Sequence, residues 1–82
     1  MAYQAVNEPI EVLVAFKGKE IEPMLFKWGG RHYRVKRVNL VHTERQGREK
    51  HYIFSVSDEA NAFRLRFSTE TLKWSLEEMA SL

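Results

Sequence analysis

Apolar and polar side chains alternate along most of this chain with the two-residue period of β-strands. The alternation occurs in six segments, at residues 10–16, 20–28, 31–43, 50–57, 62–67 and 72–76. In the first segment the even-numbered residues are all apolar and therefore share one face. Short polar or glycine-containing segments separate the strands, and no apolar pattern predicts a helix long enough to cover a sheet.

The clearest turn signal is a pair of glycines at residues 29–30, between two alternating segments. Paired glycines accept the positive backbone angles of a tight hairpin turn. On the strand before this turn, the two-residue period places Met24, Phe26 and Trp28 on one face. Pro23 cannot donate a ladder hydrogen bond, so we expect this strand to start at a sheet edge or to bend there.

The third segment contains two apolar pairs that are out of phase. Tyr33 and Val35 share one face, whereas Val38 and Leu40 are displaced from it by one residue. A β-bulge near residues 36–37 would bring both pairs to the core, because one extra residue reverses the alternation. We therefore expect a bulge or a sharp bend at this point.

The last two segments predict a hairpin. Alternation places three residues of each segment in the core, namely Phe63, Leu65 and Phe67, and Leu72, Trp74 and Leu76. If Phe67 faces Leu72 across the turn, Arg66 lies opposite Lys73 on the outer face. Like charges that face each other destabilise a hairpin by roughly some tenths of a kcal/mol. A neighbouring acidic side chain or a bound anion is therefore expected beside this pair.

These patterns predict an all-β fold, a curved antiparallel meander of five to six strands that forms a half-barrel or small barrel. The sheet has to curve because no long helix is available to cover its apolar face. A short C-terminal helical turn is also expected, because Ser75 and Glu78 have the spacing of a capping box. The expected organisation is a flexible leader at residues 1–9, a single β domain at 10–78 and a tail at 79–82.

The 82-residue length and the absence of cysteine limit what this fold can contain. A chain of this size buries only about 60% of its unfolded surface, so a deep catalytic cleft is not expected. The lack of cysteine excludes disulfides and cysteine-based zinc sites, and it fits a cytoplasmic location. The sequence shows no signal peptide and no apolar run of about 18 residues, so no membrane partner is expected.

Basic charge is concentrated in the middle of the chain. Residues 27–50 carry a net charge of +6, whereas residues 1–26 and 51–82 each carry −2. Such asymmetry favours an anionic partner. Charged side chains on exposed strands also protect sheets from aggregation, and the sequence leaves both interpretations open.

No pattern predicts a catalytic, metal or cofactor site. His32, His42 and His51 lack close ligand spacing and are not expected to share a face. The serines lack a Gly-x-Ser-x-Gly elbow, and the glycine pair at residues 29–30 precedes a strand rather than the helix of a phosphate cradle. We therefore expect a non-enzymatic domain without a cofactor or a small-molecule substrate.

The first hairpin and the later strands contain a recognisable order of motifs. Trp28-Gly29-Gly30-Arg31-His32-Tyr33-Arg34-Val35 is followed by Val38, Tyr52, Phe63-Arg64-Leu65 and Trp74-Ser75-Leu76. This order, over about residues 24–76, resembles a class of small bacterial all-β domains with an aromatic turn and a Gly-Arg-x-Tyr-x-Val strand. Some similar domains are appended to DNA-repair polymerases, so the resemblance implies a bacterial domain associated with nucleic acid or with a polymerase complex. It implies no catalytic residue.

Two functional hypotheses agree with these observations. The first is a small binding module for a protein partner or for a second copy of itself, which would use an edge strand or the exposed part of the apolar face. The second is nucleic-acid binding through a basic outer sheet face, where Arg and Lys side chains contact phosphates. The residues assigned to that face are Arg34, Lys36, Arg37, Arg64, Arg66 and Lys73.

Overall fold

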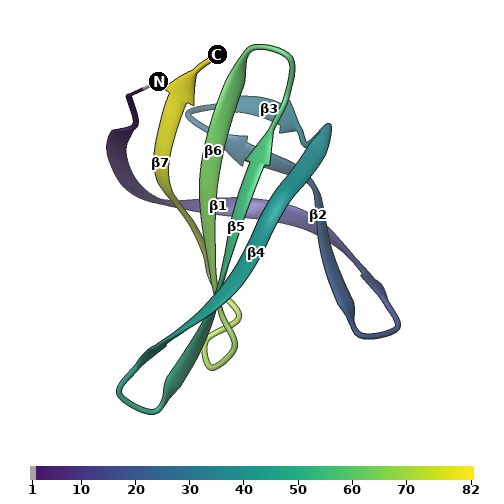
Figure 1. Ribbon diagram of the computed structural model, residues 1–82, viewed down its shortest axis with the longest axis vertical. Coiled ribbons are helices and arrows are strands. Elements are labelled where there is room, and N and C mark those ends of the chain that lie inside the picture. Colours follow the sequence, from purple (N-terminus) through teal and green to yellow (C-terminus); the bar gives the residue numbers. More distant parts are fainter. Residues whose placement is uncertain (1) are drawn as a thin grey trace.

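A computed structural model describes residues 2–82 as a curled, wholly antiparallel sheet (Figure 1). Its strands are β1 Gln4–Lys17, β2 Glu20–Trp28, β3 Arg31–Arg34, β4 Arg37–Gln46, β5 Glu49–Ser57, β6 Asn61–Ser68 and β7 Trp74–Ser81. Their order across the sheet is β3-β2-β1-β7-β6-β5-β4. The predicted all-β antiparallel class is confirmed. The expected meander is wrong, because β1 pairs with β7 and, within residues 2–82, β3 does not pair with β4. No helix long and apolar enough to cross a membrane occurs in the described chain.

The structure corrects the expected strand number and the expected chain ends. Seven strands form instead of five or six, partly because a bend at residues 35–36 divides the third segment into β3 and β4. Residues 4–9, assigned to a leader, belong to β1, and residues 79–81, assigned to a tail, complete β7. The expected helical turn does not form, because Ser75 and Glu78 both lie in β7 and pair with β1.

The sheet is strongly curled but is not closed into a barrel (Figure 1). β1 belongs to both halves of the sheet, since residues 4–10 pair with β7 and residues 11–17 pair with β2. The edge strands β3 and β4 are connected by Val35 and Lys36, which we call the β3–β4 joint. The two N–H groups of the joint donate to carbonyls of β2 and β5 at 2.9 and 3.0 Å, and beyond it the β1–β2 and β4–β5 hairpins diverge.

An irregularity in β2 decides which of its side chains reach the core. The partners of Leu13 and Val14 in β2 are Leu25 and Pro23, which leaves Met24 as an extra residue. Met24 is 38% exposed. The expectation that it shares a face with the buried residues of β2 is therefore wrong, because the bulge interrupts the two-residue period.

The predicted bend near residues 36–37 occurs at the β3–β4 joint, and a bulge follows it inside β4. The register shifts between Val38 and Leu40, so that Val38 faces Val56 in the core while Leu40 faces Ser55 on the outer side. Leu40 is consequently 57% exposed. The expected core position is thus correct for Val38 and wrong for Leu40, because the extra residue lies between them.

The core lies between the two halves of the curled sheet. Its buried cluster consists of Phe26, Phe54, Val56, Phe63, Leu65, Phe67, Trp74 and Leu76. Phe26 connects β2 to the other half, because its ring stacks on Tyr33 at 5.2 Å between centroids and meets Phe63 edge-on at 4.9 Å. The inward positions predicted for β6 from alternation are confirmed by this cluster.

Candidate functional site

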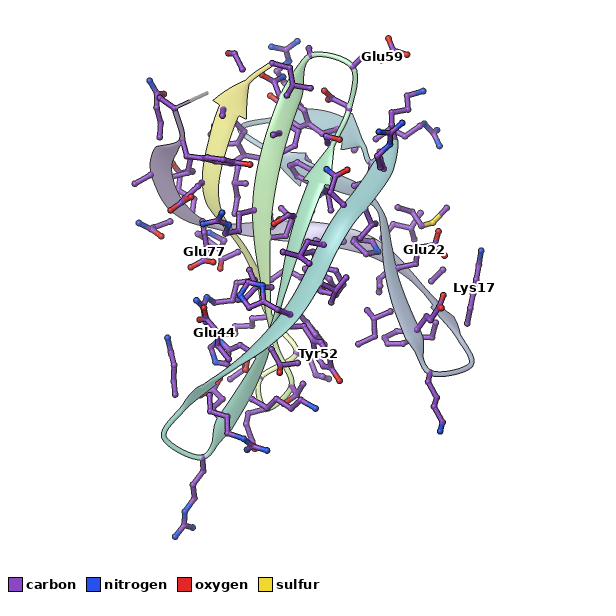
Figure 2. All side chains as sticks on the ribbon, viewed as in Figure 1. Lys17, Glu22, Glu44, Tyr52, Glu59 and Glu77 are labelled. Carbon is purple, nitrogen blue, oxygen red and sulfur yellow. The ribbon has the colours of Figure 1, made fainter. Side chains whose placement is uncertain are left out.

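The outer face of β4–β7 contains ion pairs where the sequence analysis placed part of a basic surface. Nη2 of Arg66 lies 2.9 Å from Oε2 of Glu44 and 3.0 Å from Oε2 of Glu77, and both carboxylates lie on this side of the sheet in Figure 2. Nη1 of Arg64 donates to Oε2 of Glu78 at 3.0 Å. Acidic side chains of neighbouring strands therefore offset both guanidinium charges.

His51 connects Arg66 to a further carboxylate. Nδ1 of His51 lies 2.8 Å from Nη1 of Arg66, and because a guanidinium can only donate, Nδ1 is the acceptor and the neutral ring carries its proton on Nε2. Nε2 lies 3.0 Å from Oε1 of Glu49, although this contact is too poorly aligned to be a hydrogen bond. The same carboxylate accepts a hydrogen bond from the Ser68 hydroxyl. We call the following residues the Arg66 cluster: Arg66, His51, Ser68, Glu44, Glu49 and Glu77.

The Arg66 cluster does not have the arrangement of a nucleophilic triad. In such a triad the nucleophilic hydroxyl donates a hydrogen bond to the imidazole that removes its proton. Here the Ser68 hydroxyl donates to Glu49 instead. In residues 2–82, no group of three His, Asp or Glu side chains has an arrangement that holds a metal ion.

Two carboxylates of the cluster have pKa values below the ordinary value for glutamate. Two hydrogen bonds lower the pKa of Glu44, and the one from Arg66 has a larger effect than the one from His42. For Glu49 the hydrogen bond from Ser68 lowers the pKa by more than burial raises it. Each of these two carboxylates therefore stabilises the folded state when it is ionised.

We expect the domain to lose stability in acid as these carboxylates take up protons. A carboxylate with a depressed folded-state pKa stabilises the fold above its unfolded-state pKa of about 4.3, and this contribution is lost as the pH falls through the folded-state value. The urea midpoint should decrease as the pH falls below about 4.5. The double variant Glu44→Gln with Glu49→Gln should show a weaker decrease, and an equal decrease would contradict the cluster.

The six basic residues assigned to a nucleic-acid surface lie in different parts of the fold. They are Arg34 in β3, Lys36 in the β3–β4 joint, Arg37 in β4, Arg64 and Arg66 in β6, and Lys73 in the β6–β7 turn. Arg34 and Lys36 line one surface pocket of about 380 Å³, and Arg66 and Lys73 line another of about 390 Å³. Among the described residues, no carboxylate lies within 4.0 Å of the charged groups of Arg34, Lys36 or Arg37.

The β6–β7 turn is longer than the sequence pattern predicts. Phe67 pairs with Trp74 instead of Leu72, and Arg66 pairs with Ser75 instead of Lys73. The expected like-charge pair therefore does not form. Residues 69–73 lie in the turn, so the apolar side chain at position 72 leaves the core and projects outward.

An apolar groove opens where β1 leaves β7. From residue 11 onward β1 pairs only with β2, and no strand of the described part of the chain lies along its other edge. The space beside this edge has a volume of about 550 Å³. β1 lines it with Val12, Val14 and Phe16, the β6–β7 turn lines it with Leu72, and β7 lines it with Trp74. We call this space the apolar groove.

Two exposed apolar side chains border the apolar groove. Phe16 is 65% exposed on the β1 side and Leu72 is 70% exposed on the turn side. Leu72 also has a φ of 60°. This left-handed conformation costs a residue other than glycine about 1–2 kcal/mol, and the exposed side chain gains little from burial in return.

The sequence pattern does not reveal this groove, because alternation places Leu72 in the core. The missing information was the register of the last hairpin, which depends on how many residues the turn holds.

Comparisons with protein-family models, with curated proteins and with solved structures found no match to this chain.

Proposed function

We propose that this domain is a protein-interaction module that binds an extended segment in the apolar groove. The observation that carries this proposal is an apolar groove along a strand edge that has no neighbouring strand. Extended segments bind such edges through main-chain hydrogen bonds, while alternate side chains fill the adjoining pocket. The open edge of β1 and the apolar lining supply these two kinds of contact together.

The side chains that border the groove support the same conclusion. Covering Phe16 and Leu72 would remove apolar surface from water, a gain of about 1.5–3 kcal/mol for each side chain that becomes fully buried. That gain exceeds or matches the backbone cost at Leu72. Backbone strain that the isolated chain does not offset is typical of binding sites.

Selection of displayed peptides tests this function. We expect random peptides of about twelve residues, displayed on phage and selected on the immobilised domain, to yield binders with alternating apolar residues. Leu72→Glu should weaken these binders at least about tenfold, because a charge on the groove border has to be desolvated. Leu40→Glu is the matched control, since Leu40 is also exposed, at 57%, but lies on β4 outside the groove. Binders that tolerate Leu72→Glu, or no binders at all, would refute the groove as the binding surface.

Nucleic-acid binding is the second candidate, because four exposed cations of β3, the β3–β4 joint and β4 favour it. Within residues 2–82 no carboxylate lies within 4.0 Å of their charged groups, and they are Arg31, Arg34, Lys36 and Arg37. Binding of labelled single-stranded RNA should then weaken steeply with salt and should be lost in the Arg34→Glu, Arg37→Glu double variant. Lys19→Glu, which changes an exposed cation of the β1–β2 turn, is the control. A flat titration at low salt would remove this candidate.

A further inference from the structure

We propose that the apolar groove binds a second copy of the chain, and that the two β1 strands pair antiparallel about a two-fold axis at Val14. This inference rests on the proposed function and names the partner. A strand of the second copy would lie beside residues 11–17, in the position that β7 occupies beside residues 4–10. The two β1–β2–β3 sheets would then become one continuous six-stranded sheet.

In β1, the main-chain N–H and C=O groups of Val12, Val14 and Phe16 point away from β2, toward the apolar groove. Lys17 and Glu20 flank a two-residue hairpin turn, and such flanking residues are a hydrogen-bonded pair. Because alternate residues of an antiparallel strand bond to the same neighbour, the odd-numbered residues of β1 bond to β2 and the even-numbered residues face away. Pro23 agrees with this assignment, since it lies opposite Val14 and has no N–H to donate.

Apolar side chains match each other across the proposed two-fold axis. With Val14 opposite the partner's Val14, Val12 faces the partner's Phe16, and Leu13 faces the partner's Ala15. The partner's Phe16 would then lie over Val12 in the apolar groove, which Leu72 also lines. The pairing covers Phe16 and Leu13, which are 65% and 64% exposed in the single chain.

The charges at the two ends of this segment are also complementary. The same register places Glu11 opposite the partner's Lys17, and the two-fold axis repeats this pair. Nζ of Lys17 already lies 3.2 Å from Oε2 of Glu22, but both side chains are substantially exposed. Such a surface pair is weak, so the ammonium group of Lys17 remains available to a second carboxylate.

The other long free edge does not share this complementarity. An antiparallel pairing of two β4 strands about Val41 would place Arg37 opposite the partner's Arg45, and no carboxylate within 4.0 Å offsets either charge in the described chain. Like charges opposite one another destabilise strand pairs and protect edges from association. In this register two β4 strands would bring like charges together, whereas the register about Val14 brings opposite charges together on β1.

Sedimentation equilibrium of charge-swapped variants tests the pairing. We expect the wild-type chain to be a dimer, and Glu11→Lys and Lys17→Glu each to weaken it about tenfold, because each variant creates two like-charge pairs. The double variant should recover the wild-type affinity. An equimolar mixture of the two single variants should form a heterodimer tighter than either homodimer, because every opposed pair then has opposite charge.

Further variants separate this inference from the proposed function and from a folding defect. Phe16→Glu should abolish the dimer, and its urea midpoint should match that of the wild-type chain diluted until it is monomeric, because dimerisation itself raises the midpoint. Arg45→Glu should leave the dimer intact. A dimer that ignores the charge swaps would refute the β1 pairing. A chain that stays monomeric but binds displayed peptides in the groove would refute the second copy and retain the proposed function. A monomer that binds no peptide would refute both.

Discussion

Phe26→Ala is expected to unfold this domain or to bring it close to unfolding. The side chain is 1% exposed and packs between the rings of Tyr33 and Phe63. Truncating a buried phenylalanine costs about 3–5 kcal/mol, which is comparable to the net stability of about 3–5 kcal/mol that one core supplies to a chain this short. The variant should therefore show little or no cooperative urea transition by circular dichroism.

The matched control for this substitution is Met24→Ala in the same strand. The two-residue period places Met24 on the same face as Phe26, but the bulge leaves it 38% exposed. We expect Met24→Ala to change the free energy of unfolding by less than about 1 kcal/mol. A cost similar to that of Phe26→Ala would show that β2 has the regular register instead of the bulged one.

Arg66→Met is expected to have the second-largest effect on stability. The Arg66 side chain is 17% exposed, and its guanidinium group contacts Glu44, Glu77 and Nδ1 of His51. Methionine keeps much of the side-chain volume but leaves these acceptors without their donor, which costs about 1–3 kcal/mol for a buried group. Because Glu44 is 45% exposed and Glu77 23%, water compensates part of the loss. We therefore expect a loss of about 2 kcal/mol in urea unfolding.

Two further variants identify the cause of this loss. Arg34→Met removes an exposed, unpaired guanidinium from β3 and should change stability by less than about 0.5 kcal/mol. Arg66→Lys keeps the charge but lacks the planar fork that reaches several acceptors, so it should recover only part of the loss. Equal effects of Arg66→Met and Arg34→Met would mean that the cluster contributes nothing to stability.

The cluster around Arg66 illustrates what a single sequence leaves open about charge. Arg66 and Glu44 are 22 positions apart, and only the alignment of β4, β5 and β6 brings them to 2.9 Å. The sequence alone therefore predicts that Arg66 is free to contact the phosphates of a nucleic acid. The side-chain direction was predictable from alternation, but the neighbouring carboxylates were not.

Alternation determined the all-β class and the inward face of β6, and the glycine pair determined the turn at residues 29–30, where both glycines have positive φ. These features depend on neighbours in the chain, and a two-residue period records them directly. The tertiary structure decided the positions of Met24, Leu40 and Leu72, because one extra residue in a bulge or a turn reverses or shifts every later position. It also decided the pairing of β1 with β7 and the groove beside it, since residues at opposite ends of the chain leave no common pattern in the sequence.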